Sequence, residues 1–124
     1  MALSVLLDSV ILIDHLNGVR PATRYLESLN DASISVISRA EVLAGLAVSE
    51  VGAVKEWLDR YPTFGIDLQT ADLAAELRRR HNWKLPDALQ AAVAQQHGLR
   101  LATRNTKDFP PNLYSFVLVP YTVK

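Results

Sequence analysis

The sequence predicts an α/β fold with a mostly parallel sheet of about five strands, covered by helices on both faces. Short runs of branched apolar residues alternate with longer segments of helical periodicity, which is the pattern of βαβ units. The chain has 124 residues, the length of one ordinary domain. Hydrophobic residues make up 49% of it and charged residues 21%, which is a globular composition. We therefore expect residues 1–124 to form a single domain.

In the first half of the chain, apolar runs and turn residues mark the elements in order. The run Leu3–Leu7 ends at Asp8, as a buried strand would. Helical spacing follows until Asn17-Gly18, and Pro21 fits the first turn of the next helix. The elements predicted here are strands at 3–7, 32–37 and 64–66, and helices at 11–16, 21–29, 38–46 and 51–60.

In the second half, the periodicity predicts helices at 70–81 and 86–97 and strands at 99–103 and 114–119. Pro86 starts the clearest helix of the chain, and Gly98 caps it. The basic run Arg78–His81, followed by Trp83 and Lys84, has two explanations. It complements the negative end of a helix, or it forms a rim that grips phosphates and stacks on bases.

Composition excludes several classes of protein. There is no cysteine, so disulfide frameworks and thiolate chemistry are excluded. Thirteen basic residues balance thirteen acidic ones, so no global field favours nucleic acid or membrane, and any recognition of a polyanion must be local. The apolar opening has no basic leader and contains Asp8, and no stretch has the length of a membrane span. We expect a cytoplasmic protein without membrane contact.

Acidic and amide side chains stand where the predicted strands end. Asp8 follows the first strand, Glu41 lies one turn into the helix after the second, and Asp87 opens the helix before the fourth. Asn105 and Asp108 follow the fourth strand. The carboxyl ends of parallel strands form a ligand crevice, so we expect these side chains to converge. Clustered carboxylates need a cation, and oxygen ligands suit Mg²⁺ or Mn²⁺, the metals of phosphodiester chemistry.

Each of these residues except Asp8 also has a purely structural explanation. Ser38 and Glu41 match the S-x-x-E capping box, and Asp87 would complement the positive end of its helix. Asn105 fits a turn, and Asp108 fits a helix cap before Pro110. Asp8 is harder to explain in this way, because a charge at the end of an apolar strand rarely serves packing.

Four segments of the chain resemble, in order, the four motifs of the PIN-domain family. They are Leu6–Asp14, Ser38–Leu46, Leu85–Ala94 with His97-Gly98-Leu99, and Leu101–Phe109. Their order and spacing and the length of the chain are similar to those of the VapC-type toxins of bacterial type II toxin–antitoxin pairs. The resemblance covers nearly the whole chain, and four ordered motifs are far more specific than any single acid.

The resemblance implies a Mg²⁺-dependent endoribonuclease on an α/β/α sandwich, with Mn²⁺ able to substitute. By motif, Asp8 and Asp87 would hold the metal, and Glu41 would complete the site or orient the attacking water. Ser9 stands in place of the more usual Thr and keeps its hydroxyl. Many relatives carry Asp where this chain has Asn105, so either Asn105 or Asp108 is the fourth site residue. We expect one tightly held ion rather than two.

The same resemblance implies an RNA substrate, a homodimer and a cognate VapB-type antitoxin. Arg104 and Lys107 flank the expected site and are the candidate RNA contacts. The helices of the first half carry more apolar residues than a sheet can cover, which favours a dimer interface or an antitoxin groove. These residues are Leu12, Leu16, Tyr25, Leu26, Leu43, Leu46 and Trp57.

Two other classes share some of these features. Phosphoryl acceptors of the receiver and haloacid-dehalogenase kinds also use acidic Mg²⁺ sites on parallel sheets. The second kind needs an Asp two residues after the nucleophile, where this chain has Val10, and the paired acids and late Lys of a receiver cannot be placed. A PIN-like module that binds RNA or a partner without cutting stays open, because the fourth Asp is missing.

Overall fold

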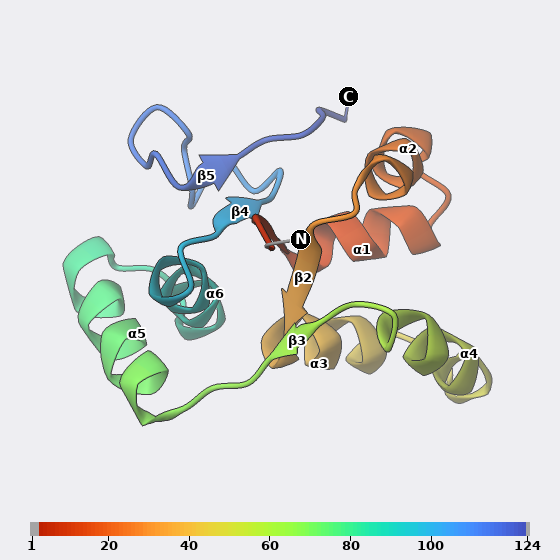
Figure 1. The fold of residues 1–124 in the computed structure, drawn as a ribbon, viewed down its shortest axis with the longest axis horizontal. Helices are drawn as coiled ribbons and strands as arrows, with labels where there is room; N and C mark the ends of the chain where they lie inside the picture. The colour runs from red at the N-terminus through yellow and green to blue at the C-terminus, as the bar shows by residue number, and fades with distance from the viewer. Residues whose placement is uncertain (1–2, 124) are drawn as a thin grey trace.

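The computed structural model describes residues 3–123 and has a five-stranded sheet with helices on both faces (Figure 1). The strands run in the order β3-β2-β1-β4-β5, and every pairing among them is parallel. Their bounds are β1 (Val5–Leu7), β2 (Ala32–Ser35), β3 (Thr63–Phe64), β4 (Arg100–Ala102) and β5 (Val117–Leu118). The α/β/α architecture expected from the sequence is confirmed.

Six helices connect these strands within residues 3–123. They are α1 (Ser9–Leu16), α2 (Arg20–Ser28), α3 (Val36–Ala44), α4 (Val48–Leu58), α5 (Leu68–His81) and α6 (Leu85–Gln96). The predicted bounds were wrong mainly at the ends. The last strand is shorter than predicted because Tyr114 lies in a turn, where its carbonyl accepts from the amide of Val117. None of the helices in residues 3–123 has the length and apolar character needed to cross a membrane.

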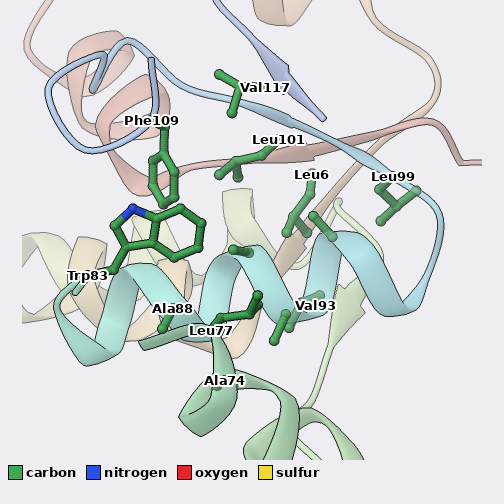
Figure 2. Close-up of a cluster of buried hydrophobic side chains, with 13 residues drawn as sticks. Leu6, Ala74, Leu77, Trp83, Ala88, Val93, Leu99, Leu101, Phe109 and Val117 are labelled. Atoms are coloured by element: carbon green, nitrogen blue, oxygen red, sulfur yellow. The ribbon is translucent and has the colours of Figure 1, made fainter. Parts of the chain in front are cut away.

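Alternating residues of the strands feed two separate cores. Leu6 and Leu101 face α5 and α6, whereas Leu7 and Ala102 face α1, α3 and α4, because consecutive residues of a strand point to opposite faces. Figure 2 shows the first of these cores, in which Trp83 and Phe109 close one end of the cluster beneath β4 and β5. β1 is therefore buried on both sides, which explains its uninterrupted apolar sequence.

The apolar residues of the early helices are covered to different degrees. Leu12 is fully buried in the second core, so its assignment to an exposed strip was wrong. Leu16 is exposed. The other members of the predicted strip pack against the second core while keeping part of their surface in solvent: Tyr25, Leu26, Leu43, Leu46 and Trp57.

The strand order reverses beside β1, and this fixes where a ligand can bind. From β1 the chain proceeds outward through β2 and β3 on one side and later through β4 and β5 on the other. In open parallel sheets the crevice lies at such a switch point, outside the carboxyl ends of the strands. Asp8 directly follows β1 at this edge, Ser35 ends β2, and Thr103 directly follows β4.

Candidate active site

An open cavity of about 470 Å³ lies at this switch point. It is lined by side chains from the segment after β1, from α3, from the first turn of α6 and from the loop after β4. The lining residues are Asp8, Ser9, Val10, Glu41, Asp87, Arg104, Asn105, Thr106 and Lys107. All but one of the residues predicted for the site therefore meet in one cavity. The exception is Asp108, which is not among them.

Asp8 is the N-cap of α1 and is held by neutral donors on both carboxylate oxygens. The amide of Ser9 donates to Oδ1 over 2.9 Å, and the Thr103 hydroxyl donates to Oδ2 over 2.7 Å. The side chain of Gln90 adds a longer bond of 3.3 Å to Oδ1. Burial raises the pKa of Asp8, and these hydrogen bonds offset only part of the increase. The carboxylate is thus fixed in place without any charge to balance it.

Gln90 and Thr103 complete a buried polar network that the sequence analysis missed. Gln90 Oε1 accepts from Ser35 Oγ at 2.6 Å, and its Nε2 donates to Ser38 Oγ at 2.5 Å. The Ser38 hydroxyl in turn donates to the carbonyl of Leu7. The network ties β1, α3 and α6 together, and Gln90 connects it to Asp8. One signal for Gln90 was present, because it stands one turn after Asp87 on the same helix.

Glu41 is not part of a capping box. α3 begins at Val36, two residues earlier than predicted, and its N-cap is Ser35, whose hydroxyl accepts from the amide of Ser38. Ser38 lies inside the helix and is fully buried. Glu41 therefore lines the cavity and remains exposed to solvent. Partial loss of solvation raises the pKa of Glu41, the charge of Asp8 raises it further, and the Ser9 hydroxyl opposes both.

Asp87 lies in the first turn of α6, as predicted. Partial burial raises the pKa of Asp87 to about 6, with further contributions from the charges of Asp8, Asp108 and Glu41. Lys84 acts in the opposite direction. A helix N-terminus would by itself favour the charged form of Asp87. Lost solvation and like charge thus outweigh the helix end, and a bound cation would favour the charged form of Asp87.

Asn105 and Asp108 are bonded to each other in the loop after β4. Asn105 Nδ2 donates to Asp108 Oδ2 at 3.1 Å, and the amide of Asn105 donates to the hydroxyl of Thr103. The carbonyl of Asp108 accepts from the indole N–H of Trp83 at 2.9 Å, which ties this loop to the segment before α6. Asn105 lines the cavity, whereas Asp108 does not, although its charge is one of those that raise the pKa of Asp87.

The two predicted RNA contacts differ in their surroundings. Lys107 is exposed at the mouth of the cavity. Arg104 also lines the cavity, but its guanidinium donates two hydrogen bonds to the buried carboxylate of Asp14. In the basic run at the end of α5, Arg78 donates to the carbonyl of Trp83, which follows the helix, and Arg80 pairs with Glu76 on the same helix.

The donors at the cavity fit a small hard cation held by few protein ligands. Within residues 3–123, no three His, Cys, Asp or Glu side chains are grouped as ligands of one metal ion. Mg²⁺ keeps several waters and commonly binds through one or two carboxylates. Asp8 and Asp87, with Glu41 and Asn105 nearby, supply the oxygen ligands of such a site, and nitrogen and sulfur ligands are missing from its lining.

Comparisons with known proteins identify the family to which the chain belongs. The PIN domain profile matches residues 5–110. Ribonuclease VapC10 of Mycobacterium tuberculosis is 37% identical over 114 residues, which cover 86% of each chain. A toxin–antitoxin complex from Klebsiella pneumoniae contains a chain that is 36% identical, with a TM-score of 0.90 over 97% of this chain and 100% of that one. FitAcB from Neisseria gonorrhoeae shares the fold, with a TM-score of 0.76 and 24% identity over 96% of this chain and 99% of that one. PIN domains are in general dependent on a divalent metal. The chain therefore belongs to the PIN-domain family, among its VapC-type members.

Proposed function

We propose that the protein is a Mg²⁺-dependent endoribonuclease, with Mn²⁺ able to substitute, and that it acts as the toxin of a VapBC-type toxin–antitoxin pair. One observation carries this proposal: Asp8, Glu41 and Asp87, from three separate elements, face one open cavity, and the pKa of each is raised. The comparisons support it, because a relative at 37% identity is named a ribonuclease and a neighbour at 36% identity is described as part of a toxin–antitoxin complex.

Within this proposal, Asp8 and Asp87 hold the metal. When bound, the cation polarises the phosphodiester group and neutralises the charge that develops on it. Asp8 contributes a carboxylate already fixed by three hydrogen bonds. Glu41 faces the cavity with a raised pKa, so it can orient the attacking water and accept its proton. Ser9 positions Glu41 through its hydroxyl, and Asn105 serves as the uncharged fourth residue of the site.

We infer that RNA reaches this site through its phosphates. Lys107 is exposed in the lining of the cavity, and the guanidinium of Arg104 lies on the same rim, paired with Asp14. Lys107 therefore supplies the local positive charge for a phosphate in a chain whose formal net charge is zero, and Arg104 adds hydrogen-bond donors. Because RNA is the substrate, the proposed site of action is the cytoplasm.

The proposed partners are a second copy of the chain and a VapB-type antitoxin. A cavity of about 280 Å³ between α1, α2 and α4 has a lining that includes Leu26, Leu29, Trp57 and Tyr61. Such a groove suits an amphipathic segment with spaced apolar anchors. We also infer that residues 1–124 act as a single PIN domain, because β5 pairs with β4 although it lies beyond the matched residues 5–110.

The test is cleavage of single-stranded RNA by the purified protein with Mg²⁺. Asp8→Asn, Glu41→Gln and Asp87→Asn should each reduce the rate by at least about 100-fold, because each removes one charge from the metal site. Glu76→Gln is the matched control, since it neutralises an exposed carboxylate of an ion pair on α5 and should leave the rate unchanged.

Two outcomes would contradict this assignment. Cleavage by Asp87→Asn at the wild-type rate would show that the site is wrongly placed. Binding of RNA by the wild-type protein without cleavage, with Mg²⁺ or Mn²⁺ present, would instead favour the PIN-like module that binds without cutting. Circular dichroism of each variant checks that the fold is retained.

A further inference from the structure

Arg104 borders three carboxylates and pairs with none of them. It lines the cavity together with Asp8, Glu41 and Asp87. An arginine next to free carboxylates would normally form a bidentate pair with one of them. Its Nε and Nη2 instead donate to Oδ2 and Oδ1 of Asp14, at 2.6 and 2.8 Å.

The Asp14 carboxylate is buried and fixed in a position where it binds this arginine. It lies in the second half of α1, where only 4% of the residue is exposed. Tyr121, which follows β5, donates its hydroxyl to Oδ2 at 2.7 Å. The Arg104 guanidinium keeps the pKa of Asp14 below its usual value despite burial, so the ion pair stays charged at neutral pH. Three segments distant in sequence are thus joined at one carboxylate.

Among the described residues, the hydrogen bonds and ion pair of the Arg104 guanidinium go to Asp14 and not to the carboxylates of the cavity. Burial is the largest influence on the pKa values of Asp8, Glu41 and Asp87, followed by hydrogen bonds and neighbouring charges, and Arg104 is not among the groups that shift them. The guanidinium therefore lies on the cavity wall with its charge already balanced by Asp14.

We propose that Asp14 is a positioning residue that keeps Arg104 out of the acidic cavity, so that the carboxylates of the cavity remain free for a divalent cation. The proposal rests on the metal site of the proposed function. Without Asp14, Arg104 has the acidic cavity as its nearest alternative and becomes an internal competitor of Mg²⁺. The edge of the guanidinium that Asp14 does not occupy stays available to a phosphate on the rim.

The experiment is a calorimetric titration of the purified protein with Mn²⁺ and with Mg²⁺ in the absence of RNA. Asp14→Asn should weaken metal binding by about five- to ten-fold, because it removes the charge that retains Arg104. The double variant Asp14→Asn with Arg104→Gln should bind metal as tightly as the wild type. Glu76→Gln again serves as the matched control on an unrelated ion pair and should change nothing.

Rescue by the second substitution distinguishes competition from a structural defect. If Asp14→Asn binds metal as the wild type does, or if the double variant stays as weak as Asp14→Asn alone, the proposal is overturned. If Asp14→Asn does not fold, Arg104→Lys and Arg104→Gln provide the same comparison with Asp14 intact. A lysine cannot occupy both carboxylate oxygens, so it should bind metal less tightly than the glutamine variant, and equal affinities would overturn the proposal.

The failure of this proposal can be told apart from failure of the proposed function. If the metal affinities follow the expected order but the protein does not cut RNA, the proposed nuclease function is contradicted and the role of Asp14 is not. Wild-type cleavage of RNA combined with unchanged metal affinity in Asp14→Asn would contradict only the role of Asp14. A wild-type protein that binds neither Mn²⁺ nor Mg²⁺ would overturn both.

Discussion

Two carboxylates at opposite ends of α1 are buried to nearly the same extent and are treated in opposite ways. Asp8 caps the helix and is 7% exposed, and Asp14 lies in its second half and is 4% exposed. Asp8 receives hydrogen bonds from neutral groups alone, and burial raises its pKa. Asp14 receives two bonds from Arg104 and one from Tyr121, and its pKa is lowered.

The difference shows how the fold separates a structural acid from an acid of the site. Neutral donors fix the position of a carboxylate and leave its charge unbalanced, which is the condition a cation site requires. A guanidinium fixes the position and balances the charge, so nothing remains for a cation to do. The hydrogen-bond partners, and not the degree of burial, therefore indicate which aspartate belongs to the metal site.

The largest expected effect that tests this comparison is on stability. Asp14→Ala should lower the free energy of unfolding by about 3 kcal/mol, because it breaks the buried ion pair with Arg104 and leaves the Tyr121 hydroxyl without its acceptor. Asp8→Asn should leave stability without metal unchanged or slightly raised, since it removes an unbalanced buried charge. Urea unfolding with EDTA present measures both. Equal losses in the two variants would show that the two carboxylates do not differ as described.

A smaller effect is expected in the pH dependence of stability without metal. The pKa of Asp87 is about 6 in the folded protein against 3.8 ordinarily, so the folded state holds a proton that the unfolded state releases. Stability should therefore fall as pH rises from about 4 to about 6, and Asp8 and Glu41 act in the same direction. Asp14, with its lowered pKa, acts oppositely: its contribution is present above 3.8 and is lost as pH falls through its folded value.

Urea unfolding at several pH values in EDTA checks this expectation. Asp87→Asn should flatten the decline between pH 4 and 6, and Glu76→Gln should not. Saturating Mg²⁺ should remove the decline in the wild type, because the bound cation compensates the charges. A wild-type stability that rises through this window would contradict the description of the acidic cavity.

The sequence predicts the sheet well because its central strands are buried on both faces. Leu3–Leu7 and the residues around Leu101 are apolar runs that end in polar residues, and β1 and β4 lie there. Helix ends were less predictable where two caps compete. Ser35 and Ser38 both fit an N-cap of α3, and the choice of Ser35 follows from tertiary contacts, because the Ser38 hydroxyl donates to Leu7 in a neighbouring strand.

The candidate site was predictable in its acids and not in its supports. Asp8 follows β1, Glu41 lies in the helix after β2, and Asp87 lies in the first turn of α6, and the topology brings these positions to one edge of the sheet. Thr103 and Gln90 contact Asp8 only after β4 and α6 are assembled beside β1. The pairing of Arg104 with Asp14 joins residues 90 positions apart, and no local pattern distinguishes it from an arginine that faces RNA.

The smallest expected effect concerns the fourth position of the site. Asn105→Asp adds a charged oxygen ligand to the cavity wall, which should tighten binding of Mn²⁺ by about three-fold. The same change removes the amide that donates to Asp108 at 3.1 Å and sets two carboxylates against each other, so stability in EDTA should fall by about 1 kcal/mol.

Asp108→Asn removes that repulsion and separates the two effects. Added to Asn105→Asp, it should restore stability while keeping the tighter metal binding, because Asp108 does not line the cavity. Loss of the tighter binding in the double variant would place Asp108 among the metal ligands. Unchanged affinity in Asn105→Asp itself would place residue 105 outside the metal site, so its role would be structural, like that of Asp14.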